Sequence, residues 1–235
     1  MSAFQGAIIA AGRGERLRAS GGARIPKPLV EVGGVPMLVR QARAMLEVGA
    51  RGVSAVINSE TAALVGNLAL PPELSLIVRD TASSMESLFT VGESLGPGHF
   101  LLATVDAILP RGEFARFASE AQAATASGNC DGALAVVKWR GDKRPLFTRV
   151  AASGLIEEIG ARLAPLVTAG LYWMPTAIFA LAAKARARKL AAMRDFLAML
   201  VAERYRLRAI EVTDAIDIDE AADLEAARRQ VENLR

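Results

Sequence analysis

A glycine-rich stretch directly after the first apolar run of the chain has the residue types of a phosphate-binding loop. Residues 6–10 predict a strand, and residues 10–17 continue it with the sequence Ala-Ala-Gly-Arg-Gly-Glu-Arg-Leu. Glycines at the end of a strand let backbone N–H groups approach a phosphate, and the side chains of Arg16 and Lys27 can neutralise its charge. The stretch therefore predicts a polyphosphate-binding loop. Its candidate nucleotide-binding residues are Ala10, Ala11, Gly12, Gly14, Arg16 and Lys27.

The spacing of this loop excludes two common phosphate-binding motifs. A dinucleotide fingerprint needs a third glycine where Leu17 stands, and a Walker A loop needs Gly-Lys-Ser/Thr, which the chain lacks. A glycine turn without a ligand explains Gly12 and Gly14 by themselves. It does not explain why Arg16 and then Pro26-Lys27-Pro28 follow them.

These residues together resemble the signature of the sugar-phosphate nucleotidylyltransferases, also called NDP-sugar pyrophosphorylases. The resemblance is dense over residues 6–40, where Lys27-Pro28-Leu29-Val30 and Val32-Gly33-Gly34 follow the loop. It implies a Rossmann-like nucleotidyltransferase fold of the glycosyltransferase A type, a magnesium ion and a nucleoside triphosphate. A phosphate oxygen of the second substrate would attack the α-phosphorus and release pyrophosphate. The resemblance makes Arg16, Lys27 and Asp106 the catalytic residues.

Two aspartates are the metal ligands that the resemblance implies. Asp106 follows the expected strand 99–103 and therefore lies at the sheet edge that carries the glycine loop. In the family an aspartate at this place binds magnesium, and a second one near the C-terminus joins it, which corresponds to Asp217. Magnesium needs few carboxylates because phosphate oxygens and water complete its shell. Asp219 could share the role or cap the last helix, and a cap is the structural alternative for Asp106 too.

Ser83 and Ser84 precede an expected helix over residues 85–95, where family members carry a loop against the nucleobase. A serine N-cap explains the same residues, and the two roles are compatible.

Three residues in the second half resemble the family strand that lies beside the sugar: Thr168, Gly170 and Tyr172. Alternation of apolar residues alone would predict an ordinary strand there. Many relatives carry Glu-Lys before this strand, with the lysine on the sugar phosphate, but residues 156–160 contain no lysine. Lys138, Lys143 and Arg162 are the candidates to replace it.

The elements that must position these residues predict an α/β fold. Short apolar runs alternate with helical spacings in the first half, and strands without intervening helices follow in the second. This pattern predicts a mostly parallel central sheet, flanked by helices, with a small antiparallel extension, in a single domain spanning residues 1–235. The expected strands are 6–10, 53–57, 74–78, 99–103, 132–139, 147–151, 167–174 and 207–212. The expected helices are 37–48, 60–68, 85–95, 112–127, 176–189, 193–203 and 219–234.

Composition excludes several other classes of protein. One cysteine, Cys130, and one histidine, His99, exclude an internal disulfide and the usual zinc sites. We expect an inert thiol at Cys130 and a strand-start residue at His99. The net charge is only +3, and the basic clusters at 184–189 and 204–208 lack interleaved aromatics, so neither predicts nucleic-acid binding. No apolar run predicts a membrane span or a secretory signal, and we expect a cytoplasmic protein.

The expected activity is transfer of a nucleotidyl group from an NTP to a sugar 1-phosphate, or to a similar phosphorylated alcohol such as phosphocholine. Val105, which replaces a family glycine, and the absent Glu-Lys slightly favour the alternative of a non-catalytic nucleotide-binding or regulatory protein. The presence together of Arg16, Lys27, Asp106 and Asp217 argues against that alternative. A relative of the molybdenum-cofactor nucleotidyltransferases is a second alternative. The loop at residues 19–25 argues against it, because those enzymes usually reach the corresponding lysine through a shorter loop. The base, the acceptor and the oligomeric state stay open.

Overall fold

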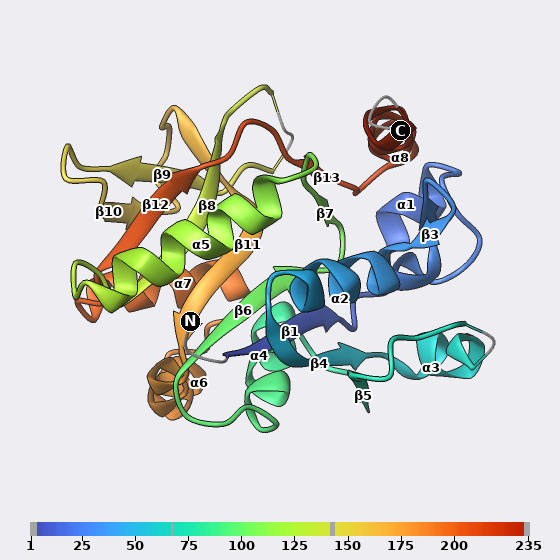
Figure 1. Cartoon of the computed structure of the whole chain (residues 1–235), viewed down its shortest axis with the longest axis horizontal. Coiled ribbons are helices and arrows are strands. Elements are labelled where there is room, and N and C mark those ends of the chain that lie inside the picture. The colour runs from blue at the N-terminus through green and yellow to red at the C-terminus, as the bar shows by residue number, and fades with distance from the viewer. Residues whose placement is uncertain (1–3, 67, 142–143, 233–235) are drawn as a thin grey trace.

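The computed structural model describes residues 4–66, 68–141 and 144–232, and strands alternate with helices along its first half (Figure 1). The strands here are β1 (Phe4–Ala10), β4 (Ala50–Ile57), β5 (Leu74–Val78) and β6 (His99–Thr104). The helices that follow them are α2 (Met37–Glu47), α3 (Ser59–Val65), α4 (Ser84–Gly92) and α5 (Glu113–Ala126). The four expected strand–helix units are therefore confirmed.

The second half is richer in strands. Its longer elements are β8 (Gly132–Lys138), β9 (Phe147–Val150), β10 (Ile156–Ile159), β11 (Leu166–Pro175), α6 (Ala182–Ala187), α7 (Met193–Ala202), β12 (Leu207–Glu211) and α8 (Ala221–Glu232). The helix expected over residues 176–189 is divided, because a 3₁₀ helix, η2 (Thr176–Leu181), precedes α6. The expected end of the last helix, residues 233–234, lies outside the described residues.

Short elements surround the glycine loop. They are α1 (Glu15–Ala19), the 3₁₀ helix η1 (Lys27–Leu29), β2 (Glu31–Val32), β3 (Val35–Pro36), β7 (Ala107–Ile108) and β13 (Ile216–Asp217). Figure 1 shows α1, β3 and α8 near one another at one end of the molecule, and α8 packs on β2. The elements that follow β1 and the last helix thus contribute to the same region.

Within the described residues, nine strands form one mixed sheet whose main path is β10-β9-β11-β6-β1-β4-β5, with β8 on β11 and β12 on β8. The pairings give seven strands one direction, namely β1, β4, β5, β6, β8, β9 and β12, whereas β10 and β11 run the opposite way. The mostly parallel sheet is confirmed. The reversing strand β11 lies inside the sheet, next to β6.

Helices cover both faces of this sheet, so its central strands are buried on both sides. On β1, Ile8 belongs to the core beneath α2 and α5, and its neighbour Ile9 belongs to the core beneath α4 and α7. Successive side chains of a strand point to opposite faces, which explains why β1 reads as a continuous apolar run. Among the described residues, no helix is long and apolar enough to cross a membrane.

The basic clusters near α6 and α7 are held by acidic partners. Lys184 pairs with Glu203 at 2.5 Å, Arg186 with Glu86 at 2.7 Å, and Arg206 with Asp131 at 2.7 Å. Their charges are thus at least partly satisfied within the chain.

Candidate active site

The glycine loop connects β1 to α1 and is shaped by two glycines with different surroundings. Gly14 has φ +64°, and a Cβ there would lie 2.8 Å from the Cβ of Lys27. Gly14 therefore allows both the left-handed turn into α1 and the close passage of Lys27. Gly12 is exposed, and a Cβ there would meet nothing within 4 Å. Packing thus does not explain Gly12, whose surface is open to a ligand.

The buried side-chain amide of Asn58, which the sequence did not predict as part of the site, is hydrogen-bonded to the backbone of the glycine loop. Asn58 lies between the end of β4 and the start of α3 and is 3% exposed. Its Nδ2 donates to the carbonyls of Ala11 (3.1 Å) and Gly12 (3.5 Å). Its Oδ1 accepts from the backbone N–H of Thr61 at 2.8 Å and caps α3. The sequence pattern of asparagine before a helix indicates a cap, but it cannot indicate the contact with the loop.

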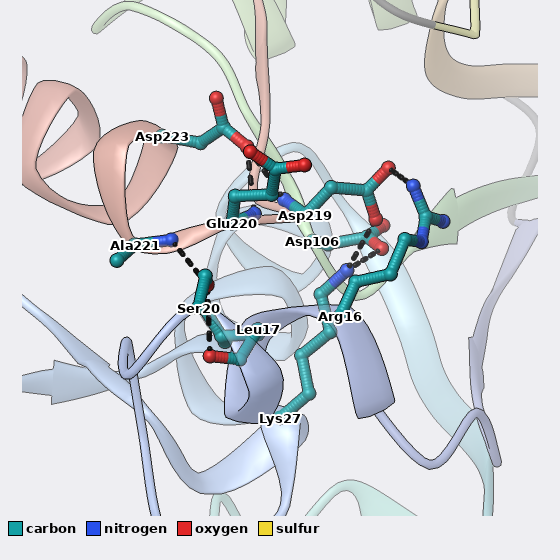
Figure 2. A network of polar contacts seen from close by, with 9 residues as sticks. All are labelled: Arg16, Leu17, Ser20, Lys27, Asp106, Asp219, Glu220, Ala221 and Asp223. Atoms are coloured by element: carbon teal, nitrogen blue, oxygen red, sulfur yellow. Dashed lines mark hydrogen bonds and ion pairs between the residues drawn. The ribbon is translucent and has the colours of Figure 1, made fainter.

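Lys27 places a buried cation in the centre of the site. The side chain is 9% exposed, and its Nζ lies 2.5 Å from Oδ2 of Asp106 and 3.3 Å from Oδ1 of Asp219 (Figure 2). Burial would lower the pKa of Lys27, but the negative charges of Asp106, Asp217 and Asp219 outweigh burial and raise it. Lys27 is therefore a permanently charged group at neutral pH.

Asp106 and Asp217 are brought together by a two-residue ladder. Asp106 lies between β6 and β7, and β7 pairs antiparallel with β13 so that Ala107 is opposite Asp217. The backbone N–H of Ile218 donates to the carbonyl of Asp106 at 3.2 Å. The structure thus joins the two aspartates that the sequence analysis proposed as metal ligands.

Asp219 completes an acidic cluster with them. One carboxylate oxygen from each of Asp106, Asp217 and Asp219 lies within 4.8 Å of the others. Asp219 also forms an ion pair with Arg16 of α1. At the start of the last helix, Asp223 accepts from the N–H groups of Asp219 (3.0 Å) and Glu220 (2.7 Å), whereas the carboxylate of Asp219 faces Arg16 and Lys27.

The charges of this cluster suit a divalent cation. Burial acts to raise the pKa of Asp106, but the Lys27 charge and hydrogen bonds outweigh it and lower the pKa. The negative charge of Asp106 raises the pKa of Asp217 well above its usual value. One lysine thus does not relieve the repulsion among the three carboxylates. Hard oxygen ligands at this spacing fit Mg²⁺, whose charge would relieve it.

Ser83 and Ser84 both have structural partners at the start of α4. Ser83 is the N-cap and accepts from the N–H of Glu86 at 3.2 Å. The hydroxyl of Ser84 accepts from the N–H of Met193 at 3.0 Å and so connects α4 to α7. The N-cap interpretation of Ser83 is confirmed, while contact of either serine with a nucleobase stays a prediction.

Gly170 brings β11 against the strand end that carries Asp106. It has φ +72°, and a Cβ there would lie 2.5 Å from Cβ of Ala107 and 2.6 Å from Oγ1 of Thr104. The register of β11 with β8 shifts between Thr168 and Tyr172, on either side of this glycine. Only glycine fits this position without a shift of its neighbours.

Tyr172 is 3% exposed, and burial raises its pKa, with a further rise from the charges of Asp217 and Asp106. The side chain of Thr168 acts in the opposite direction on this pKa. Gly170 thus packs beside the strand end that carries Asp106, and Tyr172 lies within the field of Asp106 and Asp217. A sugar contact stays a prediction for Thr168, Gly170 and Tyr172.

The other sequence candidates lie as follows. Lys138 pairs with Glu211 at 3.7 Å, Arg162 is exposed, and Lys143 lies outside the described residues. His99 begins β6, as expected, and its Nε2 lies 3.0 Å from the carbonyl of Asp131. Cys130 is buried, and burial raises the pKa of its thiol, which agrees with an inert role.

Comparison with known proteins relates this architecture to one family. A family model described as the MobA-like NTP transferase domain matches residues 6–198. The match extends across residues 19–25, so the length of that loop does not place the chain outside this family. None of the curated proteins compared matches the chain.

Solved structures share the fold at low sequence identity. A putative glucose-1-phosphate thymidylyltransferase from Bacillus anthracis has a TM-score of 0.82 and 16% identity, covering 99% of this chain and 97% of that one. UDP-glucose pyrophosphorylase complexed with UDP-glucose has a TM-score of 0.80 and 14% identity, with 100% of both chains covered. The inositol-1-phosphate CTP transferase from T. maritima has a TM-score of 0.78 and 18% identity, covering 98% of this chain and 96% of that one.

Proposed function

The chain belongs to the family of MobA-like NTP transferase domains, and from this we propose that it is an active nucleotidylyltransferase. It transfers a nucleoside monophosphate group from an NTP to a phosphate of a small phosphorylated molecule. A phosphate oxygen of the acceptor forms a bond to the α-phosphorus, the bond from that phosphorus to the bridging oxygen breaks, and pyrophosphate leaves. The reaction needs neither a redox partner nor a further co-reactant.

The observation that carries this proposal is the contact of Lys27 with Asp106 inside a cluster of three carboxylates beside the open glycine loop. A polyphosphate and an attacking phosphate are both anions, so their approach needs neutralisation and positioning more than acid–base catalysis. The site supplies a buried cation, a second cation and backbone N–H groups next to a metal-ligand set.

Each residue has a role in this proposal. The N–H groups of the loop from Ala10 to Gly14 bind phosphate oxygens, and Asn58 holds the loop in place. Lys27 and Arg16 donate to phosphate oxygens and leave their present carboxylate partners to do so. Thr168, Gly170 and Tyr172 lie on the acceptor side.

Asp106 and Asp217 are the residues that would hold Mg²⁺, with Asp219 close enough to share the ion. Bound there, the ion supplies Lewis-acid stabilisation of the charge that develops on phosphate oxygens.

The class of acceptor is proposed from the resemblance in sequence and from the names of the structural neighbours. Sugar 1-phosphates, phosphocholine and related phosphorylated alcohols are the acceptors we propose, and the structural neighbours carry names of enzymes for glucose 1-phosphate and inositol 1-phosphate. The MobA-like description of the family favours keeping a phosphorylated pterin of the molybdenum cofactor as a second candidate.

The test is pyrophosphate release, with and without Mg²⁺, over a matrix of the common NTPs and dTTP against these phosphates. We expect release that requires one nucleotide, one acceptor and the metal. A non-catalytic nucleotide-binding protein would instead show a nucleotide-dependent rise in melting temperature and no release. Asp106→Ala further distinguishes an enzyme from a non-catalytic nucleotide-binding protein. In an enzyme the substitution lowers turnover by orders of magnitude, whereas in a binding protein it changes only the affinity for nucleotide.

A further inference from the structure

Helix α2 buries one polar side chain within its apolar face. Gln41 is 3% exposed, although its neighbours on this face of the helix include the fully buried Leu38, Ala42 and Met45. An amide in such surroundings is costly unless it is hydrogen-bonded. Its Nε2 donates to the carbonyl of Ala107 at 2.5 Å, so the partner lies on β7, in the residue directly after Asp106.

The ladder between β7 and β13 leaves this carbonyl without a partner on β13. Ile218 donates to the carbonyl of Asp106, and hydrogen-bonded residues alternate with non-bonded ones along an antiparallel pair. Ala107, one residue further and opposite Asp217, therefore turns its peptide groups away from β13. The Gln41 amide meets the carbonyl on that side.

From this geometry we propose that Gln41 is a positioning residue, which fixes β7 so that Asp106 and Asp217 stand at the separation a divalent cation requires. The inference rests on the proposed function only in naming the cation site. It concerns a residue in a different element, whose amide donates to a backbone carbonyl rather than to a carboxylate.

The need for such a restraint follows from the charges. Carboxylate oxygens of Asp106 and Asp217 lie within 4.8 Å of each other, where like charges repel, and the ladder that joins the two residues is only two residues long. On the other side, Gly170 packs β11 against Ala107. Gln41 and Gly170 thus hold the same short strand from two directions, and hydrogen bonds behind a ligand typically change metal affinity by about 10–100-fold.

The test compares Gln41→Met with Gln230→Met. Methionine preserves the length and helix propensity of glutamine and removes the donor. Gln230 lies on α8, and its sheltered amide has no recorded hydrogen-bond partner in the described part of the chain, so the same change there serves as the matched control. Gln41→Asn, which keeps the amide but is one methylene too short, covers the case in which Gln41→Met does not fold.

The readout is Mn²⁺ binding to the protein alone, followed by electron paramagnetic resonance, beside the Mg²⁺ dependence of pyrophosphate release. We expect both Gln41 variants to bind Mn²⁺ about 10-fold more weakly than wild type. Gln230→Met stays within twofold, and the nucleotide KM at saturating Mg²⁺ stays within threefold for all variants.

A folded Gln41 variant that binds Mn²⁺ as tightly as wild type would overturn the inference. The inference would also be overturned if the wild-type protein showed no saturable Mn²⁺ binding. If wild type binds Mn²⁺ through Asp106 but releases no pyrophosphate with any substrate pair, the proposed function fails while the role of Gln41 is still decided by the binding data.

Discussion

The Nζ atom of Lys27 lies 2.5 Å from Oδ2 of Asp106, although 79 residues separate the two in sequence. Lys27 follows the glycine loop, and Asp106 follows the central strand β6, which is parallel to the strand β1 before that loop. The contact therefore depends on the parallel pairing of β1 with β6. It also explains how a side chain that is 9% exposed keeps its charge, since a buried cation needs a paired anion.

Replacing Lys27 with methionine tests the centre of the site. The variant keeps most of the volume and removes the charge that the polyphosphate would meet. We expect kcat/KM for pyrophosphate release to fall by about 10²–10³-fold, as for the loss of one electrostatic donor in other enzymes. Lys184→Met is the control, because Lys184 is a surface lysine paired with Glu203, and it should stay within twofold of wild type. A Lys27 variant within a few-fold of wild type would remove Lys27 from the catalytic residues.

The sequence predicted the strands with buried runs better than the short ladders at the site. Ile8 and Ile9 enter opposite cores, so β1 reads as a continuous apolar run. Strand β10, with the sequence Ile-Glu-Glu-Ile, shows no alternation and was not anticipated. Strands β7 and β13 have two residues each, which is too short for any periodicity to identify.

Some residues of the site could be predicted from the sequence, and others could not. Asp106 could be found because it follows a strand end at the sheet edge of the glycine loop, and Lys27 because it follows that loop in a pattern that resembles the family. The roles of Asn58 and Gln41 could not, since each acts by donating to a carbonyl that is distant in sequence. The sequence could not decide between Asp217 and Asp219 as the second metal ligand. In the structure, the register of β13 and the hydrogen bond from the N–H of Asp219 to Asp223 accompany a cluster that contains both carboxylates.

Asp217→Asn should stabilise the metal-free protein while removing its activity. A carboxyl whose pKa is higher in the folded than in the unfolded state holds its proton better when folded. The favourable contribution of such a carboxyl to the free energy of unfolding is therefore present below pH 3.8, the usual pKa of aspartate. It decreases as the pH rises to the pKa of the folded state and is lost above that pKa. We expect the variant to melt about 2 °C higher than wild type at pH 8 without Mg²⁺.

Thermal unfolding of wild type and Asp217→Asn at pH 8 and pH 3 checks whether the substitution stabilises the protein only at the higher pH. The advantage of Asp217→Asn should disappear below pH 3.8, where both states of wild type are protonated. Addition of Mg²⁺ should raise the melting temperature of wild type and not of the variant. A variant that is less stable than wild type at pH 8 would contradict the unrelieved repulsion between Asp106 and Asp217.

Gly170→Ala should disturb the acidic cluster by a clash rather than by backbone strain alone. The new Cβ would lie 2.5 Å from Cβ of Ala107, in addition to the cost of φ +72°. We expect a loss of about 2–4 kcal/mol in the free energy of unfolding and a weaker response to Mg²⁺. Gly160→Ala, with φ +84° and nothing within 4 Å, should lose only about 1 kcal/mol. Equal losses in urea unfolding would show that the contact with Ala107 is not tight.

Asn58→Asp separates the two roles of the amide, because aspartate keeps the oxygen that caps α3 and loses the donor to the carbonyls of Ala11 and Gly12. We expect a lower melting temperature, since the cap on α3 is kept but a buried carboxylate oxygen would face the two carbonyl oxygens, and a nucleotide KM about 10-fold higher, since the loop loses its support. Asn58→Ala removes both roles and should lower the melting temperature as well. If Asn58→Asp binds nucleotide as wild type does, the glycine loop holds its conformation without Asn58, and the packing of Gly14 against Lys27 would be sufficient to shape it.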